Sequence, residues 1–180
     1  MIPLTGSGKV SNDKLNVMRT TLVRYVKYNA WANQRLLDLI SEQCSDVQLN
    51  RELISSFPTI RKTLLHIWGA ESVWLLRLQG TSPSTWSWMD FTGTQEELKK
   101  VMLENDRNWL DFIESKDENY LYATFDYKAI DGTAYASSRV EAIHHCMNHS
   151  TFHRGQLVTL LRQVGITKLP STDYITFSRL

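Results

Sequence analysis

The sequence predicts an all-α four-helix bundle with a small β-hairpin inserted before the last long helix. Two observations carry this prediction: four long segments repeat apolar residues at spacings of three and four, and one short segment alternates apolar and polar residues instead. Four amphipathic stripes can be buried against one another. At 180 residues, with 42% hydrophobic and 22% charged residues, the chain is long enough for one such core.

The first helix is expected from about Leu15 to Gln43. Its apolar residues recur at helical spacing: Met18, Leu22, Val26, Ala30, Leu36 or Leu37, and Ile40. The polar segment before it, residues 1–13, lacks the apolar core of a signal peptide. We therefore expect a flexible leader at 1–13 and a single domain at 14–180.

The second and third helices are marked by their ends. The second is expected from Pro58 or Thr59 to Gly80, which suits a helix terminus, and it is apolar on nearly all sides. The third helix is expected to begin at Thr94, because Glu97 three residues later completes a reciprocal capping pattern. The second helix should therefore be central in the bundle.

The hairpin is expected between Tyr120 and Tyr135, where residues alternate around an Asp131-Gly132 turn. The fourth helix should begin at Ser138, with Glu141 forming a capping box, and continue to Gly165 before Pro170 stops it.

The irregular connection from Thr81 to Gly93 contains Trp86, Trp88 and Phe91. This is too much aromatic area for an ordinary solvated loop. We expect the connection to pack over one end of the bundle.

Charge and cysteine content exclude several classes of protein. Lys and Arg together number 20 against 19 for Asp and Glu, without a long run of one sign, so we expect no nucleic-acid partner and no membrane surface. No apolar run reaches the roughly 20 residues of a membrane span. With two cysteines, Cys44 and Cys146, a reducing cytoplasm is the expected location.

Four of the five histidines lie on the fourth predicted helix, and the fifth is His66 on the second. Because each helical residue advances about 100° around the axis, His149 and His153 share a face one turn apart. Two imidazoles hold a metal ion poorly, and zinc sites usually take three protein ligands and water. Buried histidines without a metal would each need separate partners. The sequence therefore predicts one divalent metal ion held by His66, His149 and His153.

Four neighbouring residues have roles that the spacing leaves open. His145, one turn before His149, could be a fourth ligand, a hydrogen-bond acceptor or a proton carrier, and we expect it just outside the ligand set as the catalytic residue. Glu141 either orients His145 or only caps the helix. Cys146 is three residues before His149 and about as near the ligand face as His145, but a small buried hydrophobe is the favoured interpretation. Glu71 is either an acidic neighbour of the site or part of a helix salt bridge.

Three short motifs lie on three of the predicted helices. They are Tyr28-Asn-Ala-Trp31-Ala-Asn33, Thr63-Leu-Leu-His66, and Asn148-His149-Ser-Thr-Phe-His153-Arg154-Gly155-Gln156. Together they resemble the DinB family of helical metal-binding proteins, some of whose members are thiol transferases of the YfiT kind. The resemblance extends from about Val17 to Tyr174, and the His-x3-His-Arg-Gly-Gln motif is its most specific part.

The resemblance implies that His66, His149 and His153 bind one divalent ion, nickel, zinc or iron, in a bundle that commonly forms homodimers. It does not imply DNA binding, since the family name derives from a DNA-damage-inducible gene. We expect Gln156 to hydrogen-bond a ligand or an incoming substrate. Arg154 should pair with a carboxylate on another helix or across a dimer contact.

Three neutral imidazoles leave the ion its charge and at least one open position. This favours a metal-dependent thiol transferase or isomerase, in which a small thiol attacks an electrophile and His145 or a carboxylate handles protons. Trp86, Trp88 and Gln156 are the expected cofactor-binding residues, although core packing is the alternative role for the two tryptophans. The alternative functions are a metal-dependent hydrolase and a noncatalytic metal-binding stress-response protein.

Overall fold

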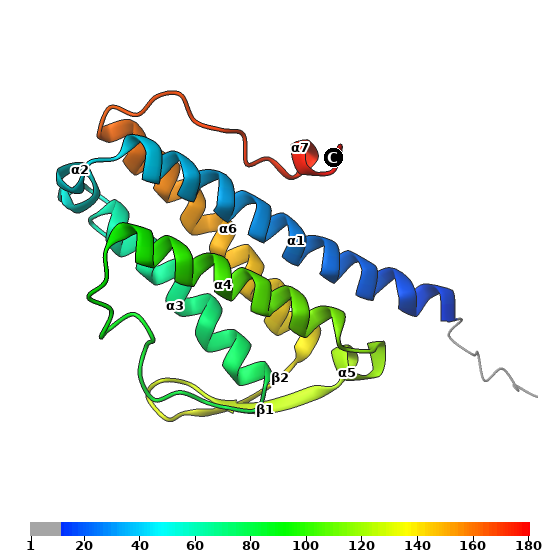
Figure 1. Ribbon diagram of the computed structural model, residues 1–180. Coiled ribbons are helices and arrows are strands. Elements are labelled where there is room, and N and C mark those ends of the chain that lie inside the picture. The colour runs from blue at the N-terminus through cyan, green and yellow to red at the C-terminus, as the bar shows by residue number, and fades with distance from the viewer. Residues whose placement is uncertain (1–11) are drawn as a thin grey trace, which may run out of the picture.

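The computed structural model describes residues 12–180, in which four long helices form a bundle (Figure 1). They are α1 (Asn12–Gln43), α3 (Ile60–Leu78), α4 (Gln95–Glu114) and α6 (Arg139–Gln163). Both α1 and α3 pack chiefly against α4 and α6. The predicted fold class, an all-α bundle with a small hairpin before the last long helix, is confirmed. Within residues 12–180, no helix has the length and apolar character needed to cross a membrane.

The predicted leader falls mostly outside the described part of the chain. Residues 1–11 are not described, and Asn12 and Asp13, which were also expected to belong to it, are the first residues of α1. The first long helix therefore begins before Leu15, the predicted start.

The interior of the bundle consists of two apolar halves separated by polar residues. One half contains Leu36, Leu64, Met102 and Leu160, and the other contains Val26, Leu75, Trp109 and Ile143. On every long helix, two buried polar residues lie between the two halves: Asn29 and Asn33 on α1, Glu71 and Ser72 on α3, Asn105 and Asp106 on α4, Ser150 and Arg154 on α6. We call these residues the polar layer. A buried leucine stabilises the fold by about 1.5–3 kcal/mol, whereas buried polar groups are tolerated only when they are hydrogen-bonded.

The buried face of α1 differs from the predicted stripe. Ala30, which the sequence pattern places in the stripe, is only half-buried, whereas Asn29 and Asn33 are 2% and 3% exposed. The stripe therefore passes from Val26 through the two asparagines to Leu37. Two amides occupy core positions because other helices supply partners for them.

The ends of α3 and α4 agree with the predicted capping residues. Thr59 accepts a hydrogen bond from the first turn of α3, and Thr94 and Glu97 form the reciprocal capping box of α4. The last residue of α3 is Leu78, and Gly80 follows with a φ of +92°, a backbone conformation that favours glycine.

The predicted hairpin consists of β1 (Thr124–Lys128) and β2 (Ala134–Ser138), which pair antiparallel. Its predicted start at Tyr120 is wrong, because a short helix, α5 (Glu118–Tyr122), precedes β1. Asp117 caps α5 by accepting a hydrogen bond from the backbone N–H of Tyr120. This local hydrogen bond favours a helical turn over the strand that the alternating pattern suggests.

Helix α6 begins after Ser138, whose Oγ accepts a hydrogen bond from the backbone N–H of Glu141. Among the described residues, the side chain of Glu141 makes no return contact with Ser138, so only half of the predicted capping box forms. The helix ends at Gln163, close to the predicted end at Gly165.

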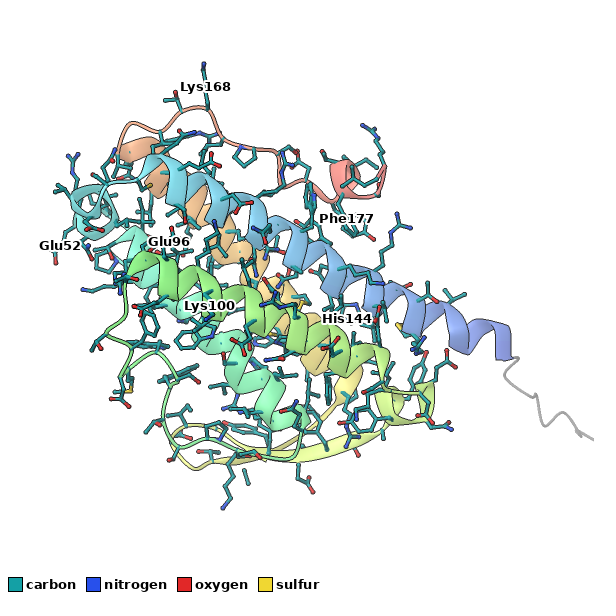
Figure 2. All side chains as sticks on the ribbon, in the orientation of Figure 1. Glu52, Glu96, Lys100, His144, Lys168 and Phe177 are labelled. Carbon is teal, nitrogen blue, oxygen red and sulfur yellow. The ribbon has the colours of Figure 1, made fainter. Side chains whose placement is uncertain are left out.

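Besides α5, two short helices were not predicted. In α2 (Asp46–Asn50), Ser45 and Gln48 form a capping box. The second, α7 (Tyr174–Phe177), lies beside α1, where the ring of Phe177 is 5.7 Å from that of Trp31 (Figure 2). The aromatic contact anchors the end of the chain to the outside of the bundle.

Helices α3 and α4 run in the same direction, so residues 79–94 must return along the bundle (Figure 1). This connection passes along the outside of α3 instead of packing only over one end of the bundle, as was expected. Trp88 lies against Gly69, where a Cβ would come within 2.1 Å of the indole, and Phe91 packs on Trp68 at 5.4 Å. A glycine at position 69 therefore allows the connection to approach α3 closely.

Candidate metal centre

Three histidines meet between α3 and α6, at the level of the polar layer. The Nε2 atom of His66 lies 3.0 Å from that of His149 and 3.2 Å from that of His153, and the last two are 3.1 Å apart. His149 and His153 reach one point because they are one turn apart on α6, and His66 approaches from α3. The structure thus brings together the three predicted ligands, while ligation itself stays a prediction.

Gln156 fixes the orientation of one of these rings. Its Oε1 lies 2.9 Å from Nδ1 of His153, and its Nε2 donates to Ser56 Oγ at 3.3 Å. An amide oxygen only accepts hydrogen bonds, so Nδ1 of His153 carries the hydrogen and Nε2 is left with a lone pair facing the other two rings. The structure therefore places Gln156 on the far side of a predicted ligand, one of the two positions expected for it.

The electrostatics of the trio keep the rings neutral at neutral pH. Burial, reinforced by the neighbouring imidazoles, lowers the pKa of His149 to about 3 and that of His66 to about 4. Burial also lowers the pKa of His153, against the effect of its hydrogen bond to Gln156. The Nδ1 atom of His149 is buried and has no hydrogen-bond partner among the described residues.

This donor set fits a divalent cation. Three nitrogens about 2.1 Å from one ion lie about 3.0–3.4 Å apart for angles between a right angle and the tetrahedral value. The observed separations of 3.0–3.2 Å fall in that range. Neutral imidazole is a good ligand for zinc, nickel and iron, and three protein ligands leave positions for another molecule.

Aromatic residues cover the trio on the side away from the core. The ring of Phe57, which precedes α3, stacks on His66 at 3.9 Å, and Trp86 lies 6.5 Å from His66. A cavity of about 130 Å³ opens beside His66, lined by Phe57, Lys62, Leu65, His66 and Trp88. Trp86 and Trp88 therefore lie next to His66, and their role in binding a cofactor stays a prediction. The contribution of Phe57 was not predicted.

His145 lies outside the trio. Its ring is 6.0 Å from that of His149 and packs edge-on against Trp74 at 5.1 Å. Burial, and to a smaller degree the positive charge of Arg77, lowers its pKa. This position agrees with the expectation that His145 is close to the ligand set without belonging to it.

Two further candidates do not reach the trio. Cys146 is completely buried in the apolar half near the hairpin, and burial raises its pKa well above the ordinary value. It therefore has the environment of a small buried hydrophobe. Glu141 is exposed and its backbone N–H binds Ser138, while no contact with His145 is formed among the described side chains.

Glu71 belongs to the polar layer and lies outside the histidine trio, and within residues 12–180 it forms no helix salt bridge. Its Oε1 accepts hydrogen bonds from Asn29 at 2.8 Å, Asn33 at 3.3 Å and Ser150 at 2.7 Å. Trp109 also donates to its backbone carbonyl at 3.0 Å. The interpretation as part of a helix salt bridge is therefore wrong, because the side chain points into the core towards donors on α1, α4 and α6. The other interpretation, an acidic neighbour of the site, agrees with its bond to Ser150, the residue after His149.

Arg154 occupies the same layer and is 2% exposed. Its Nη1 donates to the Oδ1 atoms of Asn29 and Asn33, and these asparagines donate in turn to Glu71, with Asn33 also reaching Asp106 at 3.0 Å. The predicted carboxylate pair of Arg154 is thus replaced by contacts through two amides. No direct ion pair of Arg154 is found within residues 12–180.

Comparison with known proteins gives consistent results. The family model of the DinB family matches residues 18–180. A curated relative, Protein DinB of Bacillus subtilis (strain 168), is 26% identical over 160 residues, covering 82% of this chain and 88% of that protein. The crystal structure of a DinB-like protein, YjoA from Bacillus subtilis, has the same fold, with a TM-score of 0.63 at 16% identity, covering 85% of this chain and 97% of that one.

Proposed function

The chain belongs to the DinB family, and on this premise we propose that it binds one divalent metal ion through His66, His149 and His153 and transfers an electrophile to a small thiol, or assists an isomerisation with it. Nickel and zinc are the proposed ions, with iron as a third candidate. The observation that carries the proposal is the convergence of three Nε2 atoms within 3.2 Å. Neutral nitrogens with lone pairs turned towards one point repel one another unless a cation lies between them.

The chemistry follows from the charge of the site. When bound, a divalent ion on three neutral ligands supplies a net positive charge and an open position at which a small thiol loses its proton readily. The chain's own residues supply the surroundings. Phe57 and Trp86 limit access of water, and Gln156 holds the ring of His153 in one orientation.

The cavity beside His66 is suited to the electrophile. It is lined mainly by apolar side chains, with Lys62 contributing a positive charge. We propose that a small apolar part of the electrophile binds there. His145 lies within one helical turn of the trio and is the proposed proton carrier.

Metal content tests the first part of the proposal. Protein purified without an affinity tag should contain about one equivalent of divalent metal by elemental analysis. His149→Ala and His153→Ala should lose this metal. Their matched control is His144→Ala, because His144 also lies on α6 but its ring contacts the backbone carbonyl of Val140 instead of the trio. Wild-type protein that binds no divalent ion would contradict the proposal.

Thiol binding tests the second part. Titration of low-molecular-weight thiols into cobalt-substituted protein should produce a sulfur-to-metal absorption band that is absent in His153→Ala. A screen with a generic electrophile then measures turnover. Ester or amide hydrolysis that depends on the same histidines, without a thiol band, would indicate the hydrolase, and metal binding without any turnover would indicate a noncatalytic stress-response protein.

We propose further that the protein acts in the cytoplasm as a homodimer. Exposed apolar side chains on the helices support an assembly, among them Phe152, which is 62% exposed on α6, and Ile175, which is 57% exposed on α7. Light scattering at micromolar concentration should give twice the chain mass of 20.9 kDa, and a monomer mass would refute the dimer.

A further inference from the structure

One hydrogen bond joins the two helices that carry the three histidines. Ser150 on α6 donates through Oγ to Oε1 of Glu71 on α3 at 2.7 Å. Both side chains have no exposed surface. Apart from the contacts among the histidines themselves, no other side-chain hydrogen bond in the described part of the chain links α3 to α6.

The bond lies directly beside the trio in the sequence. Ser150 follows His149, and His153 is three residues further on the same helix. A shift of α6 along α3 would therefore move both α6 histidines relative to His66. Apolar side chains tolerate small shifts, because dispersion contacts have no strong directional preference, whereas a buried hydrogen bond weakens steeply with distance and angle.

Glu71 is itself held in place. Its Oε1 also binds Asn29 on α1, and its backbone carbonyl accepts from Trp109 on α4. The carboxylate therefore has little freedom to follow Ser150 if α6 moves. Glu71 therefore fixes the position of Ser150, and through Ser150 the position of α6.

We propose that Ser150 and Glu71 are positioning residues of the metal centre, setting the register of α6 against α3 at which the three Nε2 atoms meet. This inference rests on the proposed metal binding by the trio. Neither residue contacts the ion in this arrangement. Their effect is transmitted through the backbone of α6.

The test compares two serines of the polar layer. Ser150→Ala removes the link between α3 and α6. The matched control, Ser72→Ala, removes a hydroxyl from the same layer, but that hydroxyl binds Asn105 on α4 at 3.3 Å. Both changes are small enough to preserve the fold, and both remove one buried hydrogen bond.

The readouts are metal affinity and geometry. Cobalt(II) and zinc affinities are measured by chelator competition well below the unfolding temperature, where a loss of stability alone leaves the affinity of the folded protein unchanged. Ser150→Ala should bind about tenfold more weakly, as is typical when a residue that supports metal ligands is lost, while Ser72→Ala stays within about twofold of wild type. The visible absorption of the cobalt form should change in Ser150→Ala only, because the band positions report ligand geometry.

A conservative variant sharpens the test. Ser150→Thr keeps the hydroxyl, so its affinity should lie closer to wild type than that of Ser150→Ala, although its extra methyl group strains the core. Equal affinities of Ser150→Ala and Ser72→Ala, or an unchanged cobalt spectrum in Ser150→Ala, would overturn the positioning role and leave the metal centre standing. Wild-type protein that binds neither metal would overturn the metal centre and the positioning role together.

Discussion

Neighbouring residues of α6 face two different environments. His149 and His153 turn towards His66 at the edge of the bundle, whereas Ser150 and Arg154, each the next residue in the chain, turn into the polar layer of the core. The two regions lie at the same level of the bundle and differ mainly in how their acceptors are satisfied.

In the polar layer, donors and acceptors are matched. Glu71 and Asp106 accept from asparagines, whose own oxygens accept from Arg154. In the histidine trio, three ring nitrogens converge, and the hydrogen bond to Gln156 leaves the Nε2 atom of His153 as an acceptor. A buried polar cluster that is already balanced stabilises or orients a fold, whereas one whose ring nitrogens converge on a single point has the composition of a metal-binding site.

The strongest way to break this comparison is to remove a histidine. His149→Ala or His153→Ala should abolish metal loading, because two imidazoles are too few to hold the ion. Elemental analysis and cobalt titration measure the loss, with His144→Ala as the variant that should load normally. Tight binding of one equivalent by both trio variants would mean that the ligands are elsewhere.

Removal of the Arg154 guanidinium tests the polar layer. Arg154→Met leaves the buried carboxylate of Glu71 without the only positive charge among the described residues of the polar layer, so we expect the free energy of unfolding to fall by about 3–5 kcal/mol. Urea denaturation measures it. Arg162→Met, an exposed change on the same helix, should lie within about 0.5 kcal/mol of wild type. A comparable loss in both variants would show that the layer does not depend on Arg154.

The pH dependence of stability gives a finer test of the layer. Burial, together with the adjacent charge of Glu71, raises the pKa of Asp106 well above its ordinary value of 3.8. Above about pH 3.8 the unfolded chain releases this proton while the folded protein retains it, so the contribution of Asp106 to stability falls as the pH rises towards its folded-state pKa.

Asp106→Asn should remove this dependence. The stability of the variant relative to wild type should therefore increase as the pH rises above about 4, as measured by urea denaturation at several pH values. Asp111→Asn, which removes an exposed carboxylate from the same helix, provides the control. A stability difference that does not change with pH above about 4 would indicate that Asp106 is ionised in the folded protein.

The smallest expected effect is at His145. Because its ring packs on Trp74 and lies 6.0 Å from His149, His145→Ala should change metal affinity by less than about threefold. It should instead alter the pH profile of any thiol-dependent activity. Complete loss of metal would make His145 a ligand.

The two regions also differ in how well the sequence predicts them. The trio could be inferred because the spacing of His149 and His153 on a helix is itself a ligand pattern, and only His66 remained to complete it. Asn29 and Asn33 have the same spacing, but asparagine has no single preferred chemistry. Their role depends on donors and acceptors from three other helices, which no local pattern contains.

A competing local hydrogen bond explains why the predicted start of the hairpin is wrong. The alternation through Leu121 and Phe125 is typical of a strand, yet the capping bond of Asp117 turns residues 118–122 into a helix. The sequence also did not predict that α4 runs in the same direction as α3. Because of this direction, the connection containing Trp86 and Trp88 lies alongside α3 and next to His66.

The position of Trp86 has an optical consequence. Its ring lies 6.5 Å from that of His66, so an ion held by the trio would be close to an indole fluorophore. Ions with a partly filled d shell, such as nickel(II) and cobalt(II), quench nearby tryptophan emission, whereas zinc(II) has a filled shell and does not. The intrinsic fluorescence of the protein should therefore distinguish which metal occupies the site, and the difference between metals should diminish in Trp86→Phe.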